Sequence, residues 1–215
     1  MLDFVQSSFA WEHRDAIAHG VLVSLSIFVP VTILSLVLGV GIAVLRYTRL
    51  PFLGDFADYY VKFFRNVPAI VKLFFLFFAV NLGGLESAII GLTIHHAAYM
   101  AEVVQAGMNS SSSVLEQVAL ASGFSRGQAL RYVVLPVSLR LVVPPMTTQI
   151  VQILKNTAVA MSITVPELTF VLSTLNEETF RSVQVAVIGT VIYASLAAAI
   201  IGVMMAIERR YRLSI

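Results

Sequence analysis

Seven polar side chains lie inside otherwise apolar stretches of the sequence, where they could bind a polar solute through hydrogen bonds and charge. They are Lys72, His95, Tyr99, Glu102, Lys155, Asn156 and Thr157. His95, Tyr99 and Glu102 fall at positions i, i+4 and i+7, which share one face of a helix. That face could contact a solute or a neighbouring helix, and the pattern supports both interpretations.

Metal binding and covalent catalysis have no matching pattern. His95 and His96 are adjacent, so on a helix their side chains diverge by about 100° and make a poor chelate. The HExxH spacing is absent, and there is no cysteine to act as a thiolate ligand or nucleophile. A Gly-x-x-x-x-Gly-Lys-Ser/Thr phosphate loop is also absent. The sequence therefore predicts neither a metal nor a cofactor in this chain.

The elements that must position these side chains are membrane helices. The composition is 58% hydrophobic and only 12% charged, whereas soluble domains carry about a quarter charged residues. A membrane-spanning helix needs about 20 apolar residues. Five segments meet this need approximately, at residues 20–45, 67–82, 87–108, 139–165 and 183–207. We therefore predict an all-α membrane protein with five transmembrane helices in a single domain over residues 1–215.

The depth of each charge bears on its role. Lys155 lies about ten residues, or about 15 Å, from the outer end of the fourth segment, near the membrane midplane. A charge there must face protein or water. Lys155, Asn156 and Thr157 therefore either line the solute path or hold two chains together by hydrogen bonds. Lys72 lies only about five residues inside its segment and is expected to snorkel to the surface.

Positive charge predicts the orientation, because Lys and Arg favour cytoplasmic loops. The residues on one side are Arg46, Arg49, Lys62, Arg65, Arg126, Arg131, Arg140, Arg209, Arg210 and Arg212. The other side is mainly acidic, with Asp3, Glu12, Asp15, Glu86, Glu167, Glu177 and Glu178. Five spans then place the N-terminus outside and the C-terminus inside. The stretch 51–65 is amphipathic and is either an interfacial helix or a cytoplasmic extension of the second segment, with a break at Pro68.

The loop at residues 110–138 is predicted to carry two short cytoplasmic helices. The first starts at Ser110–Ser113 and ends at a Gly123 cap, and the second runs from Ser125 to Leu135-Pro136. Apolar Leu115, Val118 and Phe124 would need a partner groove, with Glu116 and Arg126 as rim charges. The alternative is that these side chains pack within the chain.

Five motifs in order give the chain a resemblance to the polar-amino-acid branch of ABC-importer permeases. They are Phe64-Arg65-Asn66-Val67-Pro68, Ala98-Tyr99-Met100-Ala101-Glu102, the loop motif Gln117-Val118-Ala119 with Gly123 and Leu135-Pro136, Leu154-Lys155-Asn156-Thr157, and Pro166-Glu167-Leu168. The loop departs from the family pattern, because Gln117 replaces a glutamate, Val114-Leu115 replaces Gly-Gln, and Gln105 replaces a frequent arginine. These departures favour a pair of different but similar permease chains over two copies of one chain.

The resemblance implies a multi-pass protein of the bacterial inner membrane that imports a polar amino acid or similar small solute. It implies two copies of a partner ATPase that holds the ATP and Mg, a second permease chain, an external solute-binding protein, lipid contacts and no nucleic acid. The expected ATPase interface is Val114, Leu115, Glu116, Gln117, Val118, Ala119, Ala121, Ser122, Gly123, Phe124, Arg126, Leu135 and Pro136. The outer residues Glu167, Asn176, Glu177, Glu178 and Arg181 either contact the binding protein or form a solvated loop. A stand-alone secondary transporter or channel is the alternative, although no internal repeat supports it.

Overall fold

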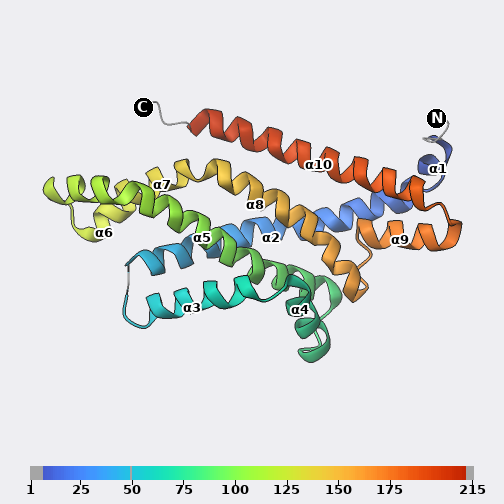
Figure 1. The fold of residues 1–215 in the computed structure, drawn as a ribbon, viewed down its shortest axis with the longest axis horizontal. Helices are drawn as coiled ribbons and strands as arrows, with labels where there is room; N and C mark the ends of the chain where they lie inside the picture. Colours follow the sequence, from blue (N-terminus) through green and yellow to red (C-terminus); the bar gives the residue numbers. More distant parts are fainter. Residues whose placement is uncertain (1–6, 49, 212–215) are drawn as a thin grey trace. The chain divides into compact units, whose positions relative to one another are not determined.

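Every element in the part of the chain that the computed structural model describes, residues 7–48 and 50–211, is helical (Figure 1). The elements are α1 (Ser7–Glu12), α2 (Arg14–Thr48), α3 (Leu53–Asn66), α4 (Ala69–Phe74), η1 (Phe75–Ala79), α5 (Gly84–Ala121), α6 (Arg126–Ala129), η2 (Leu130–Val134), α7 (Leu135–Leu141), α8 (Val143–Asn156), η3 (Thr157–Ile163), α9 (Leu168–Thr179) and α10 (Ser182–Tyr211). Of these, η1 and η2 are π-helical and η3 is a 3-10 helix. Asp3, Arg49 and Arg212, which contributed to the predicted orientation, lie outside the described residues.

Among the described residues, three helical stretches are long and apolar enough to cross a membrane: Arg14–Thr48, Gly84–Ser110 and Ser182–Arg210. They contain the first, third and fifth predicted segments. A fourth crossing results if the two helices that meet at Val142 form one broken span. The second predicted segment contains the shorter apolar helix Ala69–Ala79. The all-helical fold with several apolar helices is confirmed, and the count of five spans stays a prediction.

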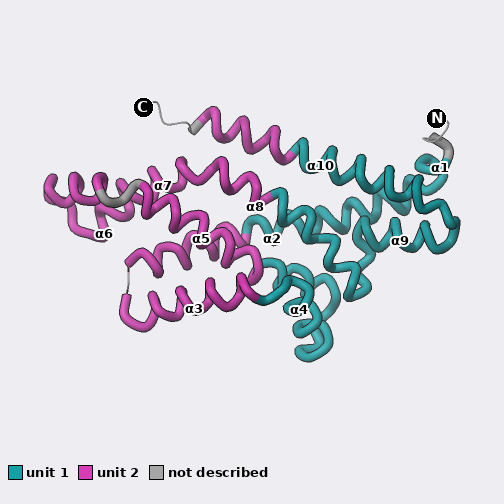
Figure 2. Tube along the Cα trace, in the orientation of Figure 1, with its two compact units in different colours: residues 1–33, 67–93, 151–199 teal, residues 34–66, 94–150, 200–215 magenta. Residues whose placement is uncertain are grey.

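The chain divides into two compact units (Figure 2). Unit 1 comprises residues 1–33, 67–93 and 151–199, and unit 2 comprises residues 34–66, 94–150 and 200–215. The helices α2, α5, α8 and α10 each contribute to both units. The single domain over residues 1–215 therefore stays a prediction.

The core of unit 1 joins α1, α2, α9 and α10. Its buried side chains are Phe9, Ile17, Leu168, Leu172, Leu175 and Val185. Leu168, Leu172 and Leu175 follow the spacing i, i+4 and i+7, so α9 presents one apolar stripe to its neighbours. Elsewhere in this unit α4 packs against η3.

Unit 2 is built around the buried face of α5. Its small and apolar residues, Ala97, Ala98, Met100, Ala101, Val104 and Met108, are fully buried. Gly39 on α2 faces this surface so closely that an added Cβ would lie 2.5 Å from the Met100 Cβ. Small residues at such positions allow membrane helices to pack closely.

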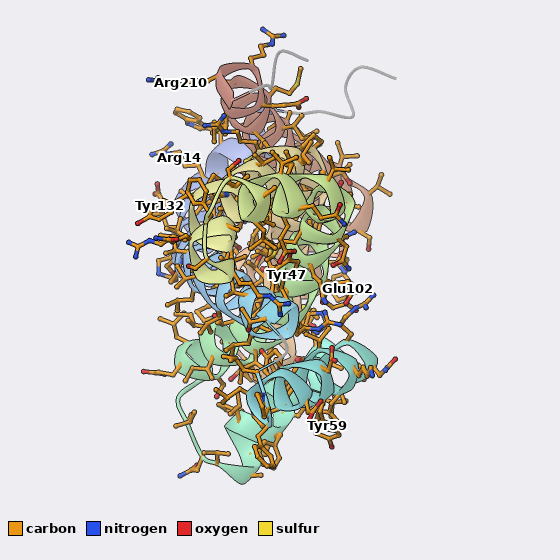
Figure 3. All side chains as sticks on the ribbon, turned by 90° about the vertical axis from the view of Figure 1, so that its left-hand side faces the viewer. Arg14, Tyr47, Tyr59, Glu102, Tyr132 and Arg210 are labelled. Carbon is orange, nitrogen blue, oxygen red and sulfur yellow. The ribbon has the colours of Figure 1, made fainter. Side chains whose placement is uncertain are left out.

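The amphipathic pattern of residues 51–65 is confirmed in α3, also part of unit 2. One face buries Gly54, Ala57 and Val61. The other exposes aromatic side chains such as Phe56 and Tyr59, and Figure 3 shows Tyr59 on the outside of this helix. Helix α3 ends at Asn66, just before Pro68.

The predicted pair of short helices differs from the structure at its start. Helix α5 runs without a break through Ser110–Ser113. Inside a long helix each backbone N–H donates to the carbonyl four residues earlier, so no capping side chain is needed there. The predicted glycine cap is confirmed. Gly123 has φ +90, its N–H donates to the Leu120 carbonyl (3.0 Å), and the Phe124 N–H donates to the Ala119 carbonyl (3.1 Å). This is the hydrogen-bond pattern of a Schellman motif.

A second helical segment starts immediately after this turn. The Ser125 hydroxyl accepts from the Gln128 N–H, and the Gln128 side chain accepts from the Ser125 N–H, which is a capping box. The segment continues through Leu135-Pro136 instead of ending there, since the π-helical turn η2 runs directly into α7, which carries Pro136 near its start. We call residues 114–128 the elbow.

Candidate functional site

The elbow exposes apolar side chains on a well-defined backbone. Val114 is 67% exposed, Val118 59% and Phe124 40%. The other predicted interface residues that lie on the surface are Gln117, Ala121, Ser122, Gly123 and Arg126. Such a contiguous exposed set on a capped turn is suited to binding a partner protein.

Five members of the predicted interface contact their own chain. Ala119 is 5% exposed and faces inward. Leu115, Leu135 and Pro136 are partly buried, and Glu116 accepts a hydrogen bond from the Tyr47 hydroxyl. Glu116 therefore ties α5 to α2 within unit 2 in addition to any contact with a partner.

Lys155, Asn156 and Thr157 lie where α8 passes into the 3-10 helix η3. The Lys155 side chain is exposed on the surface of the chain, Asn156 is partly buried and Thr157 is fully buried. The Thr157 hydroxyl donates to the Leu154 carbonyl (2.8 Å). Of the three, Lys155 is the side chain placed to meet something outside the chain.

His95, Tyr99 and Glu102 lie along α5 in unit 2, where His95 is buried and Tyr99 and Glu102 are partly buried. His95 is 8% exposed, and its ring lies 5.0 Å from the Tyr99 ring. The Tyr99 hydroxyl donates to the Arg65 carbonyl (3.3 Å), with the Arg65 guanidinium 5.4 Å from the Tyr99 ring centre. These contacts favour helix packing over solute binding for this face.

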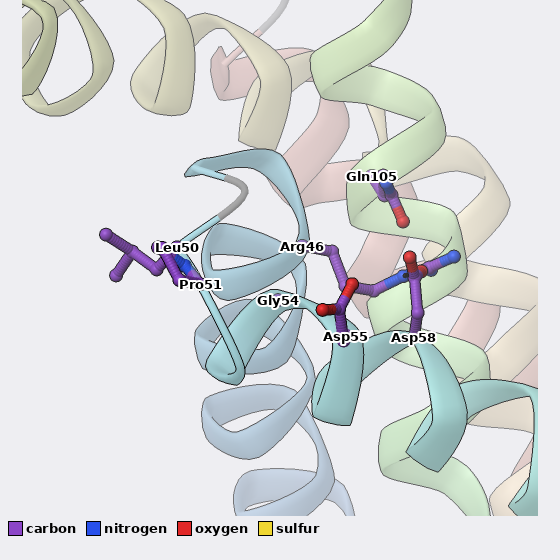
Figure 4. A pocket seen from close by; sticks show the side chains of 7 residues that line it. All are labelled: Arg46, Leu50, Pro51, Gly54, Asp55, Asp58 and Gln105. Atoms are coloured by element: carbon purple, nitrogen blue, oxygen red, sulfur yellow. Dashed lines mark hydrogen bonds and ion pairs between the residues drawn. The ribbon is translucent and has the colours of Figure 1, made fainter.

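Glu102 is the centre of an ion network that the sequence analysis did not identify. Its Oε2 lies 3.1 Å from Arg46 Nη1 and 3.3 Å from Arg65 Nη1. Arg46 Nε also lies 2.6 Å from Asp58 Oδ1. The network joins α2, α3 and α5. Its paired residues are distant from one another in sequence, and Figure 4 shows one such pair, Arg46 and Asp58. The only sequence signal for the network is that each member is a charged residue in an amphipathic or mixed segment.

Lys72 differs from its expected behaviour. The residue is 7% exposed, and its Nζ donates to the Val67 carbonyl at 2.6 Å. The side chain therefore reaches the start of its own short helix and stays inside unit 1, instead of extending to the surface.

Glu167 is corrected from an outer contact to a buried capping residue. It is fully buried and caps α9, with Oε2 accepting from the Thr169 N–H (3.0 Å) and Oε1 from the Phe170 N–H (2.8 Å). The Tyr193 hydroxyl (3.2 Å) and the Ser24 hydroxyl (3.4 Å) also donate to Oε2. Burial raises the pKa of the Glu167 carboxyl, and these hydrogen bonds oppose the rise.

The other outer residues have the exposure expected of a contact surface. Glu177, Glu178 and Arg181 are exposed, and Asn176 is partly buried. The Arg181 guanidinium lies 5.4 Å from the Phe9 ring centre. In the part of the chain that the structure describes, no group of three or more His, Cys, Asp or Glu residues could hold a metal ion.

Comparison with known proteins gives consistent matches along the chain. The model of a family described as "Binding-protein-dependent transport system inner membrane component" matches residues 20–213. The probable glutamine ABC transporter permease protein GlnP of Bacillus subtilis is 34% identical over 172 residues, covering 78% of each protein. The glutamate/aspartate import permease protein GltJ of Escherichia coli is 28% identical over 212 residues, covering 90% of this chain and 86% of GltJ.

Solved structures match the fold. A chain from a crystal structure of an amino acid ABC transporter with histidines superposes with a TM-score of 0.87 at 20% identity, covering 96% of this chain and 99% of that one. A chain from an inward-facing structure of the MetNI methionine ABC transporter gives a TM-score of 0.82 at 21% identity, covering 94% and 99%. At these identities the superpositions bear on the fold alone.

Proposed function

Because the chain belongs to the family of binding-protein-dependent transport system inner membrane components, we propose that it forms the path by which an ATP-driven importer takes up a polar amino acid. It is the transmembrane subunit of an ABC importer and a multi-pass protein of the bacterial inner membrane. Permeases of this family are not themselves enzymes, and they work with ATPase subunits and a solute-binding protein. The stand-alone transporter has no support among these relatives.

The solute class follows from the relatives. GlnP is named for glutamine and GltJ for glutamate and aspartate. Exposed Lys155 supports the same class, since an ammonium group can bind a carboxylate that every amino acid carries. We assign Lys155 to the path or gate, at an interface with a second permease chain that is similar but different.

The exposed apolar surface of the elbow is the observation that carries the coupling mechanism. Val114, Val118 and Phe124 gain from burial in a groove of the ATPase subunit, of which two copies are expected. ATP binding and Mg belong to that subunit. A capped turn moves as a rigid piece, so the ATPase motion is transmitted to the helices on either side of it.

The proposed topology has five spans, with the N-terminus outside and the C-terminus inside. The segment Ala69–Ala79, extended by its flanking residues, serves as the second span, and α8 with η3 serves as the fourth. Exposed Glu177, Glu178 and Arg181 then face the solute-binding protein, with Asn176 beside them.

A pair of substitutions at Val118 tests the coupling role. The permease would be reconstituted in proteoliposomes with its ATPase and binding protein, and the ATPase rate measured with and without loaded binding protein. We expect Val118→Asp to reduce this stimulation more than about tenfold, because a charge would be desolvated in the groove. The near-isosteric Val118→Thr is the matched control and should keep most of the stimulation.

Because Val118 is exposed, neither substitution disturbs the core, and a change in ATPase stimulation therefore reports docking rather than misfolding. Thermal unfolding of both variants should match the parent protein. Full stimulation by an assembled Val118→Asp complex would contradict docking at the elbow. Solute uptake into liposomes without ATP would instead support a stand-alone transporter.

A further inference from the structure

The helix that follows Lys155 has an uncommon form. Helix η3 continues α8 directly and has seven residues of 3-10 helix, whereas 3-10 runs longer than three or four residues are uncommon because their hydrogen-bond geometry is poorer. Residues three apart in a 3-10 helix lie above one another, and Thr157, Ala160 and Ile163 are all buried. Helix η3 therefore presents one buried edge, and the contacts along that edge must maintain its form.

The end of η3 is fixed by the turn that leads to Glu167. Thr164 has φ +60, and its N–H donates to the Met161 carbonyl (3.0 Å). The Val165 N–H donates to the Ala160 carbonyl (3.3 Å), and the Glu167 N–H donates to the Val165 carbonyl (2.8 Å). The buried Glu167 is therefore joined to η3 by a short and fully hydrogen-bonded connection.

A buried polar cluster ties this turn to α2 and α10. The Tyr193 hydroxyl on α10 donates to Glu167 Oε2 (3.2 Å) and lies 2.9 Å from the Thr169 hydroxyl oxygen. The Ser24 hydroxyl on α2 donates to Glu167 Oε2 (3.4 Å) and accepts from the Leu168 N–H (3.1 Å). All of these residues belong to unit 1, drawn teal in Figure 2. Side-chain hydrogen bonds of this kind hold packed membrane helices together.

Tyr193 also reaches the start of η3. Its hydroxyl interacts with the hydroxyl of Thr157, the first residue of η3, which is fully buried. Lys155 lies just before Thr157, in the last turn of α8. The Tyr193 hydroxyl therefore contacts both ends of the segment that begins beside the exposed Lys155 side chain.

We propose that Tyr193 is a positioning residue for transport, which holds η3 so that Lys155 keeps the orientation in which it meets the solute. The Lys155 side chain is exposed, so the backbone from which it projects sets its direction. A 3-10 helix and an α-helix differ in residues per turn, so a change in the form of η3 rotates the residues next to it. This inference rests on the assignment of Lys155 to the path in the proposed function.

A double-mutant cycle of Tyr193→Phe and Lys155→Ala tests the proposal. Uptake is measured in proteoliposomes that contain the permease with its ATPase and binding protein. The probes are radiolabelled L-glutamine, L-glutamate and L-arginine, and the cycle uses the one that the parent complex transports fastest. We expect Tyr193→Phe to lower kcat/KM about tenfold, because its hydroxyl donates to a carboxylate. The double variant should transport no worse than Lys155→Ala alone, since the orientation of residue 155 no longer matters once the ammonium group is gone.

Further variants separate positioning from folding. Tyr59→Phe removes an exposed tyrosine hydroxyl on α3 and should transport at the parental rate. Thr157→Val removes the hydroxyl at the start of η3 with little change of shape and should reduce uptake as Tyr193→Phe does. Thr157→Ser keeps the hydroxyl and should transport nearly as well as the parent protein. If Tyr193→Phe does not assemble with the partner subunits, Thr157→Val takes its place in the cycle.

Three results would overturn the proposal while the proposed function stands. They are parental uptake by Tyr193→Phe, losses that multiply to about a hundredfold in the double variant as independent effects do, and Thr157→Ser transporting no better than Thr157→Val. Parental uptake by Lys155→Ala would instead remove Lys155 from the path and this proposal with it. A parent complex that takes up none of the three probes would contradict the proposed solute class itself.

Discussion

Lys155 is exposed on the surface of the chain although it belongs to a segment predicted to lie in the membrane. A charge at that depth costs several kcal/mol unless it faces water or another protein. We therefore expect Lys155→Ala to reduce solute transport more than about tenfold in proteoliposomes, an effect of about 1.4 kcal/mol or more. Co-purification with the partner subunits should be unchanged.

Lys62 provides a matched control for Lys155. It is an exposed cation on α3, and Lys62→Ala should transport at nearly the parental rate. Unchanged solute affinity and turnover in Lys155→Ala would remove this residue from the path. Loss of assembly in Lys155→Ala would instead assign it to the contact between the two permease chains.

Glu167 should contribute to stability, because its carboxylate caps α9 from a buried position. Glu167→Ala leaves the Thr169 and Phe170 N–H groups without an acceptor, which should cost about 1–3 kcal/mol in thermal unfolding. Glu167→Gln keeps one acceptor and should lose less. If both variants unfold at the parental temperature, the cap contributes nothing.

The pH dependence of the same residue has a definite sign. Because burial raises its pKa above the ordinary 4.5, the contribution of Glu167 is complete below that value and is lost as the pH rises through the folded-state pKa. The stability of the parent protein relative to Glu167→Gln should therefore be highest in acid and fall as the pH rises. Unfolding temperatures measured in a pH series for both proteins provide the check.

These two residues show what the sequence could and could not predict about single side chains. Lys155 could be singled out from the sequence because the cost of a charge depends on its depth in an apolar segment, and its place in the path stays a prediction. Glu167 was misplaced because glutamate is not among the preferred N-cap residues, and its partner Ser24 lies far away in sequence. The pairing of Arg46 with Glu102 is equally non-local, so no local pattern indicated it.

At the scale of elements, two glycines of α2 should respond oppositely to the same substitution. Gly39→Ala would place a Cβ 2.5 Å from the Met100 Cβ, so α2 and α5 must separate, at a cost of about 1–3 kcal/mol. At Gly41, no atom lies within 4 Å of the position that an added Cβ would take. Gly41→Ala should therefore stabilise the helix by about 0.5–1 kcal/mol.

Thermal unfolding of both variants in the same detergent measures this difference. Because both sites lie in one helix, effects of helix propensity are shared, and the gap between the variants reports the close approach. Equal unfolding temperatures would mean that α2 and α5 do not pack tightly at Gly39.

Element boundaries were predictable where one strong local signal acts alone. Gly123 ends its helix because only glycine adopts φ +90 readily, and Pro68 separates α3 from α4. The serines at 110–113 misled, because their capping preference is weaker than the continuous hydrogen bonds of α5. The break at Val142 within the fourth predicted segment comes just before Pro144 and Pro145, a local signal that the sequence analysis did not use.

At the scale of the whole molecule, the absence of cysteine allows the topology to be tested directly. Ser122→Cys places a thiol on the exposed elbow, and Glu178→Cys places one on the exposed end of α9. With five spans and the N-terminus outside, residue 122 follows the third span and faces the cytoplasm, while residue 178 follows the fourth and faces outward. Both sites tolerate substitution, since both side chains are on the surface.

A membrane-impermeant maleimide distinguishes the two positions. In spheroplasts it should label Glu178→Cys and spare Ser122→Cys, and in inside-out vesicles the pattern should reverse. The unmodified chain has no thiol, so all labelling comes from the introduced residue. Labelling of Ser122→Cys in intact spheroplasts would place the elbow outside, where no ATPase can reach it, and coupling through Val118 would be impossible. Labelling of both variants only in inside-out vesicles would leave docking at the elbow possible but require an even number of crossings between residues 122 and 178.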